Sequence, residues 1–457
     1  MCVRRRIWLF LAAFVVYNLN LRPIPAGDTS PAALLPFTIL ADHTLTFDRF
    51  ASWYEQSQHM VPVWFARGRD GHYYSAYPIA LPLLLTPLYS PLAAFLDIGH
   101  MPVGRLVLLG RIFEKFSASM IAALSVIAFL VLAENLTGWR AAWQATIVYA
   151  FASQTWSTAS QALWQHGASE FAIILTLLCL VRIPKQPRSC FPAALFGLCA
   201  GLTFAFRPSN GIFLCICGAY ALLARLRPAQ KAVFALCAGG VVLSCVSYSW
   251  RVFGSPLGGY SGEMQFDANP LIGLAGLLIS PSRGLFVFSP VFLFSAVGLY
   301  VWWRAGRTFR PAVYWVCIIF SAGHIAAMSL WRMWYGGFNY GPRLLTDIVP
   351  SLVILLIPAI DWTTRSTAWK LAFAVTLVFS IGVQVIGAFC YPNGHWDALP
   401  QSVDRHQERL WDWRDNQIVR SAIAGPVLLP YRLAWSFVTR GGSIDEQLLN
   451  NENVKLW

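Results

Sequence analysis

The sequence predicts an all-α polytopic membrane protein, and three observations support this fold class. Hydrophobic residues make up 57% of the 457 residues and charged residues only 12%, a balance that soluble globular domains do not reach. Hydrophobic runs close to the length that spans a bilayer recur from Phe116 to Phe389. Short basic clusters separate these runs. We therefore expect about 11 to 13 transmembrane helices.

The basic clusters predict how the helices are oriented. The first hydrophobic run, 7–19, follows Arg4, Arg5 and Arg6, and basic residues flanking a span are retained on the cytoplasmic side. The same rule places four later clusters in the cytoplasm, which are 182–188, 225–231, 303–310 and 361–370. The segments that must then face outward are 159–169, 207–210, 251–283, 331–343 and the tail after Cys390. A multi-pass protein of the plasma (inner) membrane, with its polar segments on the periplasmic or exterior side, is expected.

The net charge of +13 fits the same interpretation. Basic residues that lie in short clusters between apolar runs act as topology signals, so we expect no nucleic-acid partner. Most of the 10 cysteines lie inside apolar runs without the spacing of metal ligands. We expect no cofactor and no metal site built from these residues, and the sequence leaves a divalent-ion requirement open.

Three stretches depart from a simple series of spans. The apolar segment 77–96 contains four prolines, which predict a re-entrant element or a broken pair of short helices. The loop 22–77 is long and of mixed polarity, and long ordered loops tend to be functional. The apolar stretch 423–438 is interrupted by Pro and Arg, which favours an amphipathic element on the membrane surface. We therefore expect a membrane domain over 1–390 with 22–77 as its first outer loop, followed by an outer-face tail over 391–457.

Asp28 is the candidate catalytic residue. It lies in the sequence Gly-Asp-Thr-Ser-Pro a few residues beyond the first hydrophobic run, which places it on the outer face. Asp-Thr-Ser-Pro is also a good helix start, so a capping role is the alternative, and it does not exclude catalysis. A carboxylate at a boundary between water and membrane can deprotonate an acceptor hydroxyl. Asp48 and Asp70 are weaker candidates, since a loop carboxylate is usually solvated.

Arginines and a histidine at outward junctions are candidate ligands for a charged substrate. Arg207, Arg283 and Arg343 each lie beside Gly or Pro at an outer helix junction, and guanidinium groups bind phosphate bidentately. Helix capping or contact with lipid headgroups is the alternative. In the sequence Leu-Trp164-Gln165-His166-Gly, the histidine is either a satisfied structural residue or a donor to sugar hydroxyls or phosphate, with the tryptophan as a stacking face.

Aromatic residues are interleaved with glycines between 331 and 343. Trp334, Tyr335 and Tyr340 surround Gly336 and Gly337. Such a pattern suits a pocket in which rings stack on sugars and the backbone approaches the ligand. An interfacial aromatic belt is the alternative.

Together these residues resemble the GT-C superfamily of polytopic glycosyltransferases, which depend on polyprenyl-phosphate sugars and include relatives of the dolichyl-phosphate-mannose protein mannosyltransferase type. The blocks that carry the resemblance are Gly27-Asp28-Thr29 with Leu34-Leu35-Pro36-Phe37, Gly71 to Pro78, Leu163 to Gly167, Phe253 to Leu257, Ser280 to Phe286 with Phe288-Ser289-Pro290, and Trp334 to Gly337 with Tyr340 to Arg343. The resemblance implies a GT-C-like helical bundle, Asp28 as catalytic base, and a substrate site that includes Tyr74 and Tyr77. This chain has Ala33 and Ala76 near the places where relatives carry cations, so the arginines above would have to bind the phosphate.

We therefore expect an integral membrane glycosyltransferase. The expected donor is a polyprenyl-phosphate sugar, and the expected acceptor is an envelope glycan, lipid or protein at the outer face, with membrane lipids as further partners. A single base predicts inversion at the anomeric carbon of a hexosyl or pentosyl group. A polymerase or ligase of lipid-linked oligosaccharides is one alternative, and a transporter or flippase of lipid-linked sugars is another. A glycan-binding membrane protein that has lost catalysis is the third, because the cations at positions 33 and 76 are missing.

Overall fold

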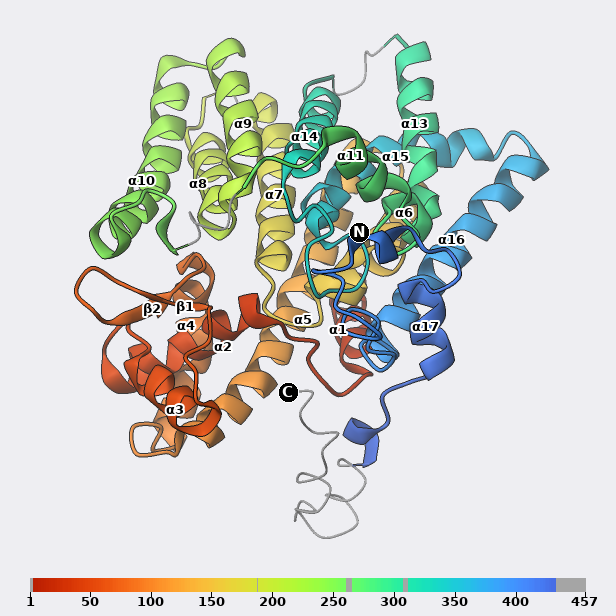
Figure 1. The fold of residues 1–457 in the computed structure, drawn as a ribbon. Helices are drawn as coiled ribbons and strands as arrows, with labels where there is room; N and C mark the ends of the chain where they lie inside the picture. The colour runs from red at the N-terminus through yellow and green to blue at the C-terminus, as the bar shows by residue number, and fades with distance from the viewer. Residues whose placement is uncertain (1–2, 187, 260–264, 307–310, 433–457) are drawn as a thin grey trace.

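The computed structural model describes residues 3–186, 188–259, 265–306 and 311–432. These residues form a helical bundle with one short antiparallel hairpin (Figure 1). Apolar side chains from most of the long helices share one large buried cluster, and a second cluster lies under the first outer loop. The predicted all-α fold is therefore confirmed.

Long helices form the body of the molecule. Helix α5 packs against α1, α6 and α7, while α8 packs against α7 and α10. Helix α13 packs against α15, and α11 packs against α14. Figure 1 shows α8, α9 and α10 on one side of the bundle and α16 with α17 (Gln417–Ala424) on the other. The bounds of the body helices are α1 Val3–Asn18, α5 Val103–Leu136, α6 Trp139–Phe151, α7 Gln165–Arg182, α8 Phe191–Phe206, α9 Gly211–Leu223, α10 Pro228–Phe253, α11 Pro270–Ile279, α12 Leu285–Phe288, α13 Leu293–Arg304, α14 Pro311–Leu330, α15 Val349–Thr363 and α16 Thr367–Phe389.

Short turns of helix join or interrupt these elements where Pro, Ser or Thr is frequent. They are η3 Thr155–Ala159, η4 Ile183–Lys185, η5 Pro208–Asn210, η7 Pro290–Phe292 and η8 Arg343–Ile348. Three of them, η4, η5 and η7, have a proline at one of their first two positions, where its missing N–H removes no helical hydrogen bond.

Six helices in the part of the chain that the structure describes are long and apolar enough to cross a bilayer. Four further apolar helices have 10 to 17 residues. The polytopic character is confirmed, although length alone qualifies fewer helices than expected. The difference arises because proline and polar turns shorten several helices, as at Pro208 between α8 and α9.

The segment 77–96 differs from the expected broken pair of short helices. It forms one continuous helix, α4 (Ala80–Phe95), with Pro87 and Pro91 inside it. Thr86 and Ser90 donate side-chain hydrogen bonds to the carbonyls of Pro82 and Pro87. These hydroxyls provide partners for carbonyls in a helix where proline has removed backbone donors.

The first outer loop is ordered around its own small core. Its elements are η1 Gly27–Thr29, α2 Ser30–Phe37, η2 Thr38–Asp42, α3 Asp48–Gln58, β1 Phe65–Arg67 and β2 Tyr73–Ser75. The strands pair antiparallel, with Phe65 opposite Ser75. Phe47 stacks on Phe65 with ring centroids 4.7 Å apart. Helix α2 packs against α4 and α5, so this loop is attached to the bundle.

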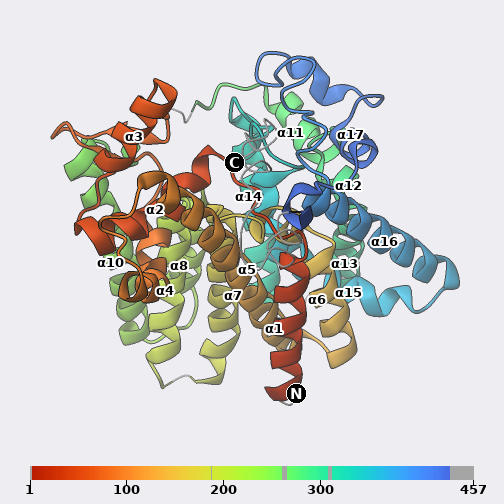
Figure 2. The same ribbon diagram turned by 90° about the horizontal axis from the view of Figure 1, so that it is seen from below.

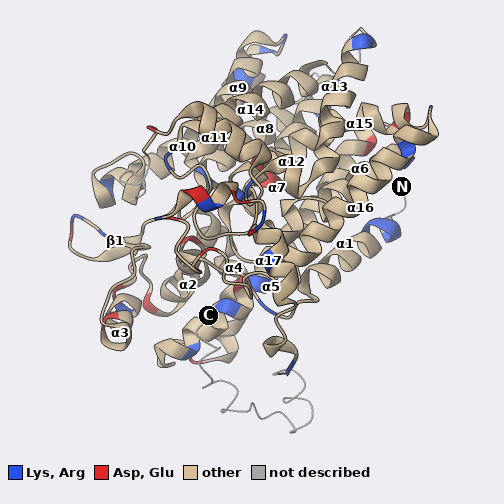
Figure 3. Cartoon of the chain, turned by 45° about the vertical axis from the view of Figure 1, so that its right-hand side comes forward, with Lys and Arg blue, Asp and Glu red and all other residues tan. Residues whose placement is uncertain are grey.

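The predicted outward segments meet at one end of the bundle. The amide of Arg69 donates to the carbonyl of Val252 at 2.8 Å, and that of Ala268 donates to Leu330 at 3.0 Å. Figure 2 shows α2, α3 and α17 toward one end of the long helices and the N-terminus at the opposite end. Figure 3 shows acidic and basic residues mixed near α2, α3 and α17, whereas the helix ends near α9 and α13 carry basic residues.

The tail folds back onto the same end. It contains η9 (Gln407–Trp411) and α17 (Gln417–Ala424), and α17 packs against α16. The side chain of Asn416 caps α17 by accepting from the amide of Val419 at 3.0 Å. The predicted amphipathic stretch 423–438 lies only partly within the described residues, and 433–457 lie outside them.

Candidate active site

Asp28 lies in the single turn η1 that leads into α2. The hydroxyl of Thr29 donates to the carbonyl of Ala26 at 3.1 Å and accepts from its amide at 3.3 Å, so the turn is closed on itself. A Cβ atom on Gly27 would lie 2.8 Å from the ring of Trp64. The turn therefore fits against Trp64 because position 27 has no side chain. Arg111 of α5 donates to the Ser30 hydroxyl at 3.0 Å and attaches the start of α2 to the bundle.

The Asp28 carboxylate has two side-chain partners. Arg343 donates to Oδ2 at 2.7 Å, and the Tyr77 hydroxyl donates to Oδ1 at 3.1 Å. Burial by itself raises the pKa of Asp28. Attraction and hydrogen bonding from Arg343, together with the Tyr77 hydrogen bond, lower it by more, so the pKa lies below its ordinary value. The side chain is still 30% exposed. Asp28 is thus an ionised carboxylate that a substrate can reach.

Arg343 is held on three sides. It begins η8, directly before the buried helix α15. Its second terminal nitrogen donates to the carbonyl of Gly336 at 2.7 Å. The ring of Trp164 lies against the guanidinium, 4.3 Å from its central carbon to the ring centroid, a favourable cation–π geometry. The structure therefore brings four predicted site residues together in one cluster, namely Asp28, Tyr77, Trp164 and Arg343.

A second buried cluster surrounds Asp347, one helical turn after Arg343. His166 Nδ1 and Asp347 Oδ2 are 2.9 Å apart, and Arg207 donates to the same oxygen at 2.6 Å. Asn210 donates to the other oxygen at 3.0 Å. Arg207 also contacts the ring nitrogens of His166. A buried carboxylate is costly without partners, so Asp347 requires these three contacts. Through them, Asp347 holds the ends of α7, α8 and α15 together.

Sequence reasoning missed Asp347. The available signal was a carboxylate four residues after Arg343, at the start of a long apolar run, since ionisable residues in such runs usually have a specific partner. Asn210 was equally accessible as the polar residue that follows Arg207 in the same outer junction.

An apolar cavity of about 280 Å³ opens beside Tyr77. It lies between the start of α4, the ends of α8 and α10, and the loop after α10, and its lining includes Tyr77, Leu83, Phe204, Tyr248 and Leu257. A smaller crevice is lined by Gln165 and Arg207. The cavity and the crevice share Pro78 and Pro208. The apolar cavity and the crevice that Arg207 lines are therefore adjacent, and the cavity borders Tyr77, whose hydroxyl donates to Asp28.

Other predicted site residues lie elsewhere. The Tyr74 hydroxyl donates to Asp70 at 2.7 Å, and burial together with this carboxylate raises the pKa of Tyr74 to about 12. Trp334 packs against Trp411 of the tail, with ring centroids 6.2 Å apart. The Tyr340 hydroxyl donates to the carbonyl of Val383 at 2.9 Å. Each of these side chains has a protein contact, and their roles in sugar binding stay predictions.

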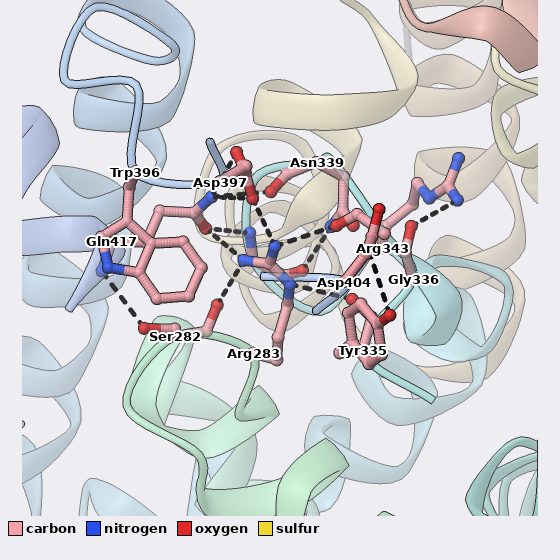
Figure 4. A network of polar contacts seen from close by, with 12 residues as sticks. Ser282, Arg283, Tyr335, Gly336, Asn339, Arg343, Trp396, Asp397, Asp404 and Gln417 are labelled. Carbon is pink, nitrogen blue, oxygen red and sulfur yellow. Dashed lines mark hydrogen bonds and ion pairs between the residues drawn. The ribbon is translucent and has the colours of Figure 1, made fainter. Parts of the chain in front are cut away.

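Arg283 and Tyr335 belong to a network with the tail (Figure 4). Arg283 is 1% exposed and donates to five oxygen atoms of the protein, one of them on Asp397 at 2.6 Å. The Tyr335 hydroxyl donates to Asp404 at 3.0 Å. The prediction of Arg283 as a phosphate ligand is untested, and its donors are directed toward the protein. Among the residues that the structure describes, no group of three or more His, Cys, Asp or Glu side chains could hold a metal ion.

Comparison with solved structures identifies proteins that share the fold of this chain. No protein-family model and no curated protein sequence matches the chain. Among solved structures, ArnT from Cupriavidus metallidurans bound to undecaprenyl phosphate superposes with a TM-score of 0.52 at 13% identity, over 92% of this chain and 75% of ArnT. AglB, an oligosaccharyltransferase from Archaeoglobus fulgidus in complex with an inhibitory peptide and a dolichol-phosphate, superposes with a TM-score of 0.50 at 12% identity, over 89% of this chain and 59% of AglB. Both neighbours are GT-C superfamily glycosyltransferases. The chain therefore has the GT-C fold that its sequence motifs led us to expect.

Proposed function

We propose that this protein is an integral membrane glycosyltransferase that uses a polyprenyl-phosphate sugar and glycosylates a cell-envelope acceptor at the outer face of the plasma membrane. The observation that carries the proposal is the Asp28 carboxylate, partly exposed and ionised beside Arg343 and Tyr77. The neighbours with the same fold were solved with undecaprenyl phosphate and dolichol-phosphate, which supports a lipid-phosphate donor here.

In the proposed reaction, Asp28 is the general base. The acceptor hydroxyl oxygen bonds to the anomeric carbon while the bond from that carbon to the phosphate oxygen breaks. Asp28 takes the hydroxyl proton, and the electron pair leaves on the lipid phosphate. One direct displacement inverts the configuration of the anomeric carbon. Arg343, which donates to the Asp28 carboxylate at 2.7 Å, would stabilise the negative charge that develops on the phosphate.

The cavity beside Tyr77 supports a donor with a hydrocarbon chain. Its lining from α4, α8 and α10 is mostly apolar, which suits an isoprenoid segment. The adjacent crevice offers Arg207 and Gln165 to a phosphate or sugar. Tyr77 lines the cavity and also donates to Asp28. A donor bound in this way would have its chain in the cavity and its phosphate near the base.

Release of free polyprenyl phosphate tests the proposal. The purified protein in liposomes would receive a panel of polyprenyl-phosphate hexoses and pentoses, with an envelope extract as acceptor source, in the presence and absence of a divalent cation. We expect release from at least one donor, and its anomeric product should be inverted. No release from any donor by a folded protein would contradict a transferase. Movement of a labelled donor across the bilayer without release would favour a flippase.

A further inference from the structure

Three consecutive carbonyl groups connect Arg283 to the candidate active site. Arg283 donates to the carbonyls of Tyr335 at 2.8 Å and Gly337 at 3.0 Å. The carbonyl between them, that of Gly336, accepts from Arg343 at 2.7 Å. Gly336 and Gly337 have φ angles of +79° and +70°, which side chains disfavour. The backbone therefore turns so that the first and third carbonyls point to Arg283 and the middle one points to Arg343.

Arg283 is itself fixed by the tail. Its remaining N–H groups donate to Asp397 at 2.6 Å, to Gln417 at 2.8 Å and to the carbonyl of Ser282 at 2.8 Å. The ring of Trp396 lies 5.3 Å from the guanidinium carbon. Figure 4 shows this guanidinium between the tail residues and the Tyr335–Gly337 turn. All five N–H donors of Arg283 are thus used for contacts within the protein.

The tail also contacts the turn directly. Gln417 accepts from the amide of Gly341 at 2.9 Å and donates to the carbonyl of Asn339 at 2.7 Å. The Tyr335 hydroxyl donates to Asp404 at 3.0 Å. The segment from 335 to 341 is therefore held by Arg283 and by the tail on both sides of the carbonyl that binds Arg343.

We infer that Arg283, with Asp397 and Gln417 of the tail, is a positioning residue that sets the Gly336 carbonyl and, through it, the placement of Arg343 on Asp28. The contacts form one chain from the tail to the base, and each link is a hydrogen bond to a buried or half-buried group. The tail contributes to the site although it follows the last long helix. This inference rests on the proposed function only where it assigns a catalytic role to Asp28.

Two tail variants and one control test the chain of contacts. Asp397→Asn removes the counterion of Arg283. Gln417→Met removes the contacts to residues 339 and 341 and one acceptor of Arg283, while keeping the ion pair. Asp267→Asn is the matched control, because Asp267 pairs with Arg332 on the exposed side of the same loop region. Folding of each variant would be checked by monodispersity and thermal unfolding in detergent.

The primary readout does not need enzyme activity. Amidation of Asp28 by a water-soluble carbodiimide and an amine, followed by mass spectrometry across a pH series, reports how the carboxyl is paired and protonated. Hydrogen exchange of peptides covering 335–343 reports whether the turn has loosened. We expect both tail variants to speed exchange in 335–343 and amidation of Asp28 several-fold, with the labelling profile moved to higher pH. Asp267→Asn should leave both unchanged.

Three results would overturn the inference. Unchanged exchange in 335–343 would show that the tail does not hold the turn, and loosened exchange with unchanged Asp28 labelling would show that the turn does not place Arg343. Equal effects in the Asp267→Asn control would show a general loss of packing. If labelling responds as expected but no donor supports Asp28-dependent release, the positioning stands and the proposed function fails. Where transfer is measured, kcat should fall about tenfold with little change in KM.

Discussion

Arg343 donates to the Asp28 carboxylate at 2.7 Å across a sequence separation of 315 residues. The first outer loop and the junction before α15 thus meet at one ion pair. Trp164 covers the guanidinium and Tyr77 donates to the other carboxylate oxygen. This pair accounts for an acidic residue that stays ionised in a half-buried position, as the proposed base requires.

Replacing Arg343 by Gln should shift the pH dependence of transfer. The pKa of Asp28 is below its ordinary value because Arg343 favours the ionised form, so losing the charge raises that pKa. The acid limb of kcat/KM, which reports the free enzyme, should therefore move to higher pH. At neutral pH we expect kcat to fall roughly 10² to 10³-fold, as when a group that stabilises the transition state is removed. An unchanged acid limb would contradict the pairing.

Two tyrosines in the same segment form a matched comparison. Tyr77→Phe removes a hydrogen bond that lowers the pKa of Asp28, so its acid limb should also move upward, by less than in Arg343→Gln. Tyr74→Phe removes only the bond to Asp70 and should leave the profile in place. Steady-state transfer across pH distinguishes them. Equal shifts in both variants would show that the effect comes from the loop as a whole.

Gly27→Ala should displace the base. Its new methyl carbon would lie 2.8 Å from the ring of Trp64, an overpacked contact that typically costs about 1 to 3 kcal/mol. We expect lower activity and a lower unfolding temperature, with partial recovery in Gly27→Ala combined with Trp64→Leu. Gly382→Ala is the control, since nothing lies within 4 Å of a Cβ at that position. Full activity of Gly27→Ala would show that the turn tolerates movement.

Asp347→Ala should destabilise the fold more than most substitutions. It leaves the buried Arg207 and His166 without their carboxylate, and breaking a buried pair costs about 3 to 5 kcal/mol. Thermal unfolding in detergent should show a midpoint lowered by roughly 5 °C or more. The exposed pair between Arg332 and Asp267 is the control, and its removal should leave the midpoint unchanged. A wild-type midpoint for Asp347→Ala would contradict the structural role of this cluster.

Filling the apolar cavity should select against long donors. Ala205 of α8 lines the cavity, so Ala205→Trp would occupy space proposed for the isoprenoid chain. We expect KM for a long-chain donor to rise at least about tenfold while a two-isoprene donor is little affected. Leu236→Trp on the exposed face of α10 is the control. Equal loss with both donors would place the chain elsewhere.

The sequence was most informative where a residue type in a given context points to a single structural or functional role. Hydrophobic runs and basic clusters predicted the helical membrane fold, and Asp28, Trp164 and Arg343 could be selected individually because charged or aromatic residues at outer junctions are conspicuous. Their pairing could not be predicted, since it joins segments far apart in the chain. Arg283 and Arg343 have similar neighbours in the sequence, yet Arg283 contacts the tail and Arg343 contacts Asp28. The two environments differ because the folded tail places Asp397 and Gln417 on Arg283, and the sequence does not show where the tail folds.

The prolines of α4 show a second limit of pattern reasoning. Four prolines in 77–96 predicted a break, but one helix continues past Pro87 and Pro91, where the hydroxyls of Thr86 and Ser90 donate to backbone carbonyls. The aromatic residues between 334 and 340 are a similar case, because a ring that packs on the tail and a ring that would stack on a sugar have the same sequence pattern.

The role of Asp28 as the base can be measured by transfer of a labelled sugar from the active polyprenyl-phosphate donor. Wild type would be compared with Asp28→Asn, and Asp70→Asn would serve as a control loop carboxylate. We expect Asp28→Asn to fold and bind donor normally but to lose at least about 10²-fold in kcat, whereas Asp70→Asn should retain wild-type transfer. Normal transfer by Asp28→Asn would contradict the assignment of Asp28 as the base.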